Sequence, residues 1–217
     1  MKKITKGAEP LPLAEWKHRN PQGRYKQLTE VERQAIRNAC TQEQYYLCAY
    51  CCQGISGTNT DTMNEHLEAQ ATAPHKTLDF SNIIASCTMS NQCDAAHGSQ
   101  ALPLTPLMNE CESELQFMIS GRVRGLTERA RRSIEVLNLG DHERNNKGLI
   151  EKRKYLSHSL LWEQGVNPEE GLEDDGLLNL LIDELCTPQD GKLEPYAPVV
   201  VNVLHQWLSN PSPNTTK

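Results

Sequence analysis

The 217-residue sequence predicts an α+β fold, with a small cysteine-pinned core of short strands between mostly α-helical N- and C-terminal segments. Two observations predict it. Paired cysteines flank a polar middle region, and the segments on either side place apolar residues at helical spacing. The cysteines concerned are Cys48, Cys51, Cys87 and Cys93. We divide the chain into an N-terminal segment with one helix (1–46), the core (47–105) and a β-hairpin with a helical C-terminal region (106–217).

The N-terminal segment is predicted to be irregular over 1–27, which contains several prolines and lysines, with Trp16 as an anchor. Thr29 precedes Glu32 by three residues, which is the spacing of a capping box. Apolar residues then recur at helical intervals, so we expect a helix over 29–45.

The core begins with a short strand-to-turn knuckle at 47–52, followed by a polar loop at 54–61 and a resumed strand at 64–67. Further on, 115–126 is predicted to form a hairpin that turns at Ser120-Gly121, with arginines alternating against a valine. Four helices are expected after it. Their ranges are 127–139, 145–163, 176–186 and 197–208.

The net charge of −6 hides an uneven distribution. Basic residues dominate 2–37 and 122–154, whereas acidic residues dominate 163–194. This asymmetry suits phosphate binding on one face and a protein partner on another; ordinary solvated helix faces are the alternative. The chain has no apolar run of about 20 residues, as a membrane helix needs, and its basic start lacks the apolar run of a signal peptide. We therefore expect a soluble, cytoplasmic protein.

The clustered cysteines predict a structural zinc site. The Cys-x-x-Cys pair supplies two thiolates from one tight turn, and Cys87 and Cys93 are the natural second pair. Zinc knuckles commonly space that pair as Cys-x-x-Cys, but Ser90 occupies the expected position here. Cys52 is set aside because adjacent residues point in different directions. Buried reduced thiols without metal are the alternative.

Glu65 and His66 offer a carboxylate beside an imidazole. Phosphodiester hydrolysis needs a base that deprotonates water and a hard cation that offsets charge on the phosphate. Adjacent residues on a strand face opposite sides, so alone this dipeptide would be two unrelated residues.

With the paired cysteines, Asn82 and Asn91, this dipeptide makes the chain resemble the HNH endonuclease family and its ββα-metal fold. The stretch 78–87 (Leu-Asp-Phe-Ser-Asn-Ile-Ile-Ala-Ser-Cys) is especially similar. More narrowly, the chain resembles the HNH component of Septu-type and retron-associated antiphage systems, up to about Leu161. The segments that carry this narrower resemblance include Lys-Gly-Ala-Glu-Pro at 6–10, Leu-Cys-Ala-Tyr-Cys at 47–51 and Gly-Arg-Val at 121–123.

The resemblance implies an HNH catalytic core over 47–105, in which His66 is the general base and Asn82 orients the loop of that histidine. It implies that Glu65 and Asn91 hold Mg²⁺ or Mn²⁺. His97 is either a further metal ligand, a phosphate contact or a structural residue. The chain departs from the family at Ala69, where many relatives have proline, which leaves the turn after the histidine open.

The resemblance also implies an effector subunit of an antiphage complex. Its substrate would be DNA by default, with RNA or tRNA as alternatives, and its products would carry 5′-phosphate and 3′-hydroxyl ends. Its partner would be an ATPase subunit of the same system, because this sequence contains no phosphate-binding loop motif, and a retron reverse transcriptase with its RNA is a further candidate.

Candidate nucleic-acid contacts lie in the second basic region, although a helix presenting bases to solvent is the commoner case. They are Arg122, Arg124, Arg129 and Arg132. The acidic stretch 163–196 and the apolar end 199–208 are candidate docking elements; alternatively, the end belongs to the chain's own core. A zinc-stabilised scaffold with an inactive site is the competing functional class. A redox role for Cys51-Cys52 is disfavoured, because no βαβ pattern surrounds the pair.

Overall fold

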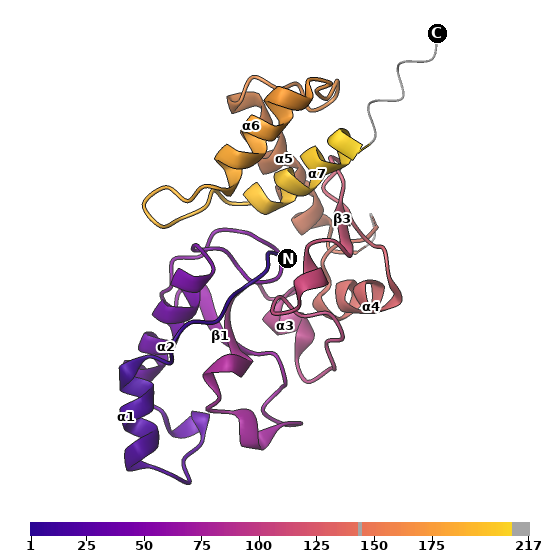
Figure 1. Cartoon of the computed structure of the whole chain (residues 1–217). Helices are drawn as coiled ribbons and strands as arrows, with labels where there is room; N and C mark the ends of the chain where they lie inside the picture. The colour runs from indigo at the N-terminus through magenta and orange to yellow at the C-terminus, as the bar shows by residue number, and fades with distance from the viewer. Residues whose placement is uncertain (143–144, 210–217) are drawn as a thin grey trace.

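The computed structural model describes residues 1–142 and 145–209. Within them the chain is mixed α and β, with seven α-helices and two small antiparallel sheets. Figure 1 shows α1 and α2 at one end and α5 to α7 at the other, with the short strands between them. The helices are α1 (Leu11–Arg19), α2 (Glu30–Glu43), α3 (Asp94–His97), α4 (Glu128–Leu137), α5 (Lys147–Glu163), α6 (Asp175–Cys186) and α7 (Ala197–Ser209). The strands are β1 (Thr62–His66), β2 (Ile83–Cys87), β3 (Leu115–Phe117) and β4 (Val123–Gly125).

The N-terminal segment is more regular than predicted, because it contains α1. Pro10 caps this helix and a second proline lies in its first turn. Proline is well tolerated there, since its fixed φ suits a helix start and its missing N–H would have had no partner. The prediction of an irregular 1–27 was therefore wrong over Leu11–Arg19. Trp16 is buried, as expected of an anchor.

The capping box that predicted α2 is present. The Thr29 hydroxyl accepts a hydrogen bond from Val31 N at 3.3 Å, and the Thr29 backbone N–H donates to Glu32 Oε2 at 2.8 Å. Near the other end, the buried amide of Gln44 accepts from Ala85 N and donates to Ala85 O, both at 2.8 Å. This side chain fastens the end of α2 to strand β2.

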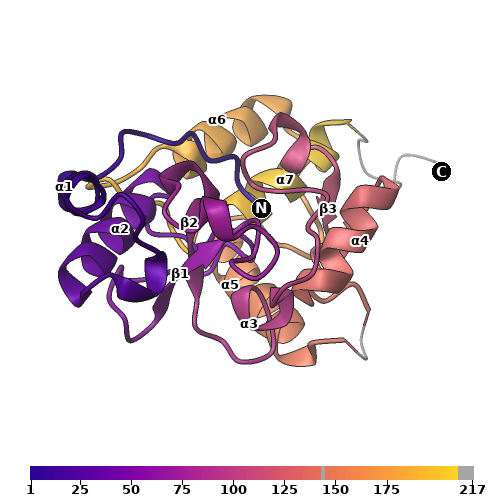
Figure 2. The same cartoon turned by 90° about the horizontal axis from the view of Figure 1, so that it is seen from below.

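Strands β1 and β2 form an antiparallel pair followed by α3, so the chain runs strand, strand, helix through the core. The register pairs Glu65 with Ile84 and His66 with Ile83, and every residue of β2 is buried. Figure 2 shows the two strands beside one another, with α3 beyond them. Because the strands are antiparallel, the end of β1 at His66 lies beside the start of β2, and Cys87 at the end of β2 lies beside the start of β1.

The C-terminal region supports the loop that leads into α3. Cys93 has a positive φ of 56°, and its N–H donates to the Leu137 carbonyl at the end of α4. Asn138, the left-handed cap of α4, donates from its side chain to the Asn91 carbonyl at 2.7 Å. The Asn146 side chain donates to Gln92 Oε1 at 3.0 Å. The strained Cys93 backbone is thus held by residues about 45 to 55 positions further along the chain.

The predicted hairpin is formed by β3 and β4, with Gly121 in the turn at φ 83°. A Cβ there would lie 2.1 Å from the Ile150 carbonyl oxygen, so only glycine fits against α5. Arg153 of α5 is fully buried and donates to the carbonyls of Gly121 at 2.6 Å and Leu139 at 3.1 Å. The hairpin and α5 are therefore locked together.

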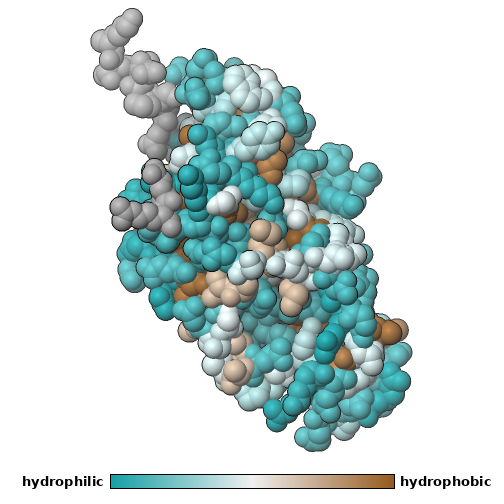
Figure 3. Space-filling view, turned by 180° about the vertical axis from the view of Figure 1, so that it is seen from behind, coloured by the Kyte–Doolittle hydropathy of each residue, from teal (hydrophilic) through white to brown (hydrophobic). Residues whose placement is uncertain are grey.

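The apolar C-terminal helix is internal. Val199, Val200, Val203 and Leu204 of α7 are buried, so the expectation that the apolar end serves as a docking element gives way to its alternative, the chain's own core. One hydrophobic cluster runs from Met1 to Val203, so the three predicted segments share a core, and a second cluster joins α5, α6 and α7. In Figure 3 the rear face is mostly hydrophilic, with scattered apolar residues. No helix among the described residues is long and apolar enough to cross a membrane.

Candidate metal centres and active site

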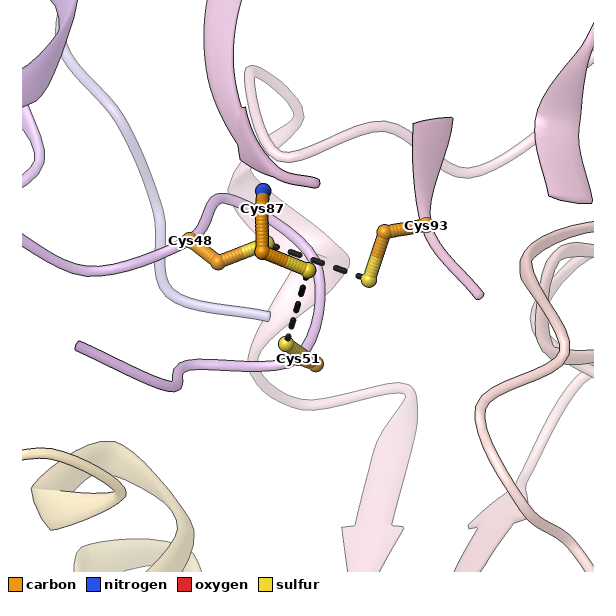
Figure 4. A group of neighbouring side chains, drawn as sticks. All are labelled: Cys48, Cys51, Cys87 and Cys93. Carbon is orange, nitrogen blue, oxygen red and sulfur yellow. Dashed lines mark hydrogen bonds between the residues drawn. The ribbon is translucent and has the colours of Figure 1, made fainter. Parts of the chain in front are cut away.

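The four predicted zinc ligands come together from three places in the fold. Two of them flank a tight turn, in which Cys52 N donates to the Cys48 carbonyl at 3.1 Å. Cys87 ends β2, and Cys93 immediately precedes α3. Figure 4 shows the four side chains directed toward a common centre. Cys52 lies outside the group, as predicted. Its backbone is left-handed, with φ 64°.

The spacing of the sulfur atoms fits a tetrahedral metal ion. The four Sγ atoms all lie within 4.8 Å of one another; Cys48 Sγ is 3.8 Å from Cys93 Sγ, and Cys51 Sγ is 4.0 Å from Cys87 Sγ. A tetrahedron with Zn–S bonds of about 2.3 Å has edges of about 3.8 Å. The four cysteines can therefore hold a zinc ion with little rearrangement.

The electrostatics of the cysteine cluster favour a cation. Burial acts to raise the pKa of the Cys48 thiol, but hydrogen bonds from the neighbouring sulfurs outweigh it and hold that pKa well below its usual value. Burial and the same neighbours hold the pKa values of Cys51 and Cys93 well above theirs. One buried thiolate thus prevents the ionisation of its neighbours, whereas a divalent ion would stabilise all four.

A second group of polar side chains is centred on Glu65, near the end of β1. Its carboxylate Oε1 accepts from His97 Nδ1 at 2.5 Å and from the Tyr50 hydroxyl at 3.0 Å. Glu65 and His97 are both buried. His97 Nε2 donates to the Gln100 carbonyl at 2.8 Å, which leaves Nδ1 as the nitrogen that faces the carboxylate. Metal-binding histidines are commonly oriented in this way, by a backbone carbonyl on the nitrogen that does not bind the ion.

Asp94 completes this group. It lies three residues before His97 on α3, so both side chains lie on one helix face, and its carboxyl group hydrogen-bonds with Glu65. Burial, the hydrogen bond and the charge of Glu65 raise the pKa of Asp94 to about 8. Burial acts to lower the pKa of His97, but the bond to Glu65 and its charge outweigh this and raise it. Asp94 and His97 thus retain protons next to the Glu65 carboxylate. A bound cation could supply the same positive charge in their place.

His66 ends β1 and is buried beside Tyr25, whose ring meets it edge-on at 4.7 Å between centroids. Its Nε2 donates to the Thr77 carbonyl at 3.0 Å, so Nδ1 carries the lone pair in the neutral ring. The exposed Gln70 side chain lies 3.4 Å from Nδ1. Burial lowers the pKa of His66, against the opposing effects of Thr77 and Glu65. A neutral imidazole whose Nδ1 has only this long contact from an exposed amide can accept a proton from water near pH 7.

Asn82 braces the loop that follows His66. Its Oδ1 accepts from Glu68 N at 2.8 Å, and its Nδ2 donates to the Glu68 carbonyl at 3.0 Å and, more weakly, to the Lys76 carbonyl at 3.4 Å. Leu67 N also donates to the Asn82 carbonyl at 3.0 Å. These bonds fix the backbone on both sides of the loop and so fix the position of the imidazole.

No family model matches this chain, and no curated protein does. The function must therefore be argued from these two groups of side chains and from the resemblance in sequence.

The structure places the remaining predicted residues less favourably. The exposed Asn91 lies in the turn before Cys93, where its carbonyl accepts a hydrogen bond from the Asn138 side chain; among the described residues its hydrogen bonding is with Asn138 and not with Glu65. Arg129 pairs with Glu114, its Nη2 lying 2.5 Å from Oε1. Of the other predicted nucleic-acid contacts, Arg132 forms an ion pair with Glu135 at 3.1 Å. Arg124 is exposed, and Arg122 lines a surface hollow beside it.

Sequence reasoning missed Asp94 and Tyr50. The three-residue step from Asp94 to His97 is a helical spacing, and with the helix that the ββα resemblance implies it could have indicated a shared face. Tyr50 gave no signal, because its contact with Glu65 arises only from folding over 15 residues.

Proposed function

We propose that this chain is a metal-dependent endonuclease of the HNH type that hydrolyses phosphodiester bonds of nucleic acid, with DNA as the default substrate. One observation carries the proposal. Glu65 is hydrogen-bonded to His97 and Asp94, and the next residue of the same strand is His66, whose pKa is lowered by burial. The strand, strand, helix order of this core agrees with the ββα arrangement that the resemblance implies.

The donor set suits Mg²⁺ or Mn²⁺. Two carboxylates and one imidazole are ligands that Mn²⁺ accepts readily, and Mg²⁺ favours the oxygen donors. We assign Glu65, Asp94 and His97 as the residues that would hold the ion, with Asp94 replacing the predicted Asn91. When bound, such a cation offsets the charge on the scissile phosphate and on the leaving oxygen.

The other residues act on the nucleophile and on its position. His66 Nδ1 accepts the proton of the attacking water, while the Thr77 carbonyl keeps the other ring nitrogen protonated. Asn82 holds the loop so that this nitrogen keeps its direction. The expected products carry 5′-phosphate and 3′-hydroxyl ends. The cysteine-bound zinc is structural, since its four ligands leave no position for substrate.

The proposal extends to the biological setting on the sequence resemblance alone. We propose an effector subunit of a cytoplasmic antiphage complex that works with an ATPase subunit of the same system, and in some settings with a retron reverse transcriptase and its RNA. Structured RNA, including tRNA, is the alternative substrate, because a metal core of this kind contacts phosphates and reads few bases.

The test is a cleavage assay of the purified zinc-loaded chain, alone and with the ATPase encoded beside it, on plasmid DNA and total tRNA with Mg²⁺ or Mn²⁺. We expect cleavage by the wild-type chain and by His75→Ala, an exposed histidine of the same loop. His66→Ala should lose at least about 100-fold in rate, the usual contribution of a general base. Equal activity of His66→Ala, or no cleavage under any condition, would favour the inactive zinc-stabilised scaffold.

A further inference from the structure

Tyr50 lies inside the zinc knuckle, between Cys48 and Cys51, and is completely buried. The backbone on either side of it is fixed. Ala49 N donates to the Ala85 carbonyl of β2 at 3.1 Å, and Cys52 N donates to the Cys48 carbonyl. With a zinc ligand two residues before it and another directly after it, the position of Tyr50 depends on the geometry of the cysteine cluster.

The side chain of Tyr50 reaches from this knuckle to the second group. Its hydroxyl donates to Glu65 Oε1 at 3.0 Å, and the same oxygen accepts from His97 Nδ1. The Tyr50 ring also meets the His97 ring edge-on, with 6.5 Å between centroids. A single side chain therefore contacts both members of the pair proposed to bind the catalytic cation.

We propose that Tyr50 is a positioning residue that couples the zinc knuckle to the catalytic carboxylate, so that the zinc-fixed backbone sets the orientation of Glu65. The inference rests on the proposed function, because it assigns Glu65 to a cation. The Tyr50 hydroxyl and His97 Nδ1 both bind Oε1, and Oε2 accepts from His66 N at 3.0 Å. The second lone pair of Oε2, and the Oε1 lone pair that His97 would release, would be available to the ion.

A phenol hydroxyl offers one hydrogen-bond donor, and here that donor is directed at the Glu65 carboxylate. Hydrogen bonds that orient a ligand in this way typically change metal affinity by about 10- to 100-fold when they are removed. A tyrosine that merely fills the core would support folding but would not change cation affinity.

The test is the Mn²⁺ affinity of the zinc-loaded full chain, measured by electron paramagnetic resonance of free Mn²⁺. We expect Tyr50→Phe to retain its zinc and its circular dichroism spectrum and to bind Mn²⁺ about 10- to 100-fold more weakly. Tyr45→Phe is the matched control, since it removes a hydroxyl from a surface tyrosine five residues earlier. A 4-aminophenylalanine at position 50, which keeps a donor on the same ring, should recover most of the lost affinity.

Glu65→Gln separates failure of the coupling from failure of the proposed function. If Glu65→Gln weakens Mn²⁺ binding while Tyr50→Phe stays within about twofold of the wild type, the coupling is wrong and the cation site stands. If the wild type and Glu65→Gln bind Mn²⁺ equally, both proposals are wrong. Loss of zinc from Tyr50→Phe would also contradict the positioning role, because the hydroxyl would then be supporting the knuckle itself.

Discussion

The cysteine cluster, which can hold a zinc ion, offers a large expected effect for a single substitution. Cys93→Ser removes one of four ligands whose sulfur spacings of 3.8 and 4.0 Å already match a Zn–S tetrahedron. Structural zinc contributes about 10–16 kcal/mol of apparent binding free energy, whereas a whole domain is stable by about 5–15 kcal/mol. Weakening the site should therefore remove most of the net stability.

The measurements are zinc content by plasma mass spectrometry and thermal unfolding by calorimetry. For a chain of this size, 1 kcal/mol corresponds to about 2–4 °C in Tm. A loss of at least 5 kcal/mol should then lower the Tm of Cys93→Ser by more than about 10 °C, with substoichiometric zinc. Full zinc occupancy and an unchanged Tm in this variant would refute the four-cysteine site.

Cys111→Ser is the matched control for that experiment. Cys111 is fully buried like the ligands, but its Sγ contacts the Pro106 carbonyl at 3.9 Å and lies outside the group of four sulfurs. We expect one zinc per chain and a Tm decrease of about 10 °C or less, from the burial of a hydroxyl.

Four further outcomes are expected. Asn82→Ala should keep zinc but lose about 2–4 kcal/mol of stability and most cleavage activity, because the backbone N–H and carbonyl of Glu68 both lose their side-chain partner. An unchanged cleavage rate would contradict the bracing role. Mn²⁺ affinity should rise about tenfold or more per pH unit from pH 6 to 7 and level off above about pH 8. The reason is that the cation displaces the proton that Asp94 holds up to about pH 8. Mn²⁺ titrations at several pH values and fixed zinc test this, and an affinity that does not change with pH would contradict it. With saturating cation, the cleavage rate should fall at acid pH with a midpoint below the ordinary pKa of an imidazole, because burial lowers the pKa of His66. A midpoint above that value would argue against this base. Arg153→Met should lower Tm by several degrees, because two buried carbonyls lose their donor, and calorimetry would show it.

Most of the secondary structure could be predicted from local signals in the sequence. The Thr29 capping box, the turn at Gly121 and the helical periodicities each depend on residues within a few positions of one another, so they could be recognised without coordinates. The Cys-x-x-Cys pair works in the same way, because the chain must turn tightly to place both sulfurs on one ion. The second pair was also found, since few other residues in the core offer soft ligands.

The parts that were missed depend on contacts between distant residues or on very short elements. Helix α3 has only four residues and gives no periodic pattern, so Asp94 was overlooked and Asn91 was assigned the role of second oxygen ligand. Helix α1 was not predicted because its segment contains prolines, although a proline in the first turn is compatible with a helix. The contact from Tyr50 to Glu65 requires the knuckle to fold back onto β1, which no local pattern in the sequence specifies.

The occupancy of the second site is the most direct test of the account. A crystal of the zinc-loaded chain soaked in Mn²⁺ should show two anomalous peaks at separate wavelengths. One should be zinc among the four cysteine sulfurs, and the other should be manganese within bonding distance of the Glu65 carboxylate and His97 Nδ1. Manganese bound elsewhere, with the hydrogen bond from His97 to Glu65 left intact, would contradict the assignment of this group as a catalytic cation site.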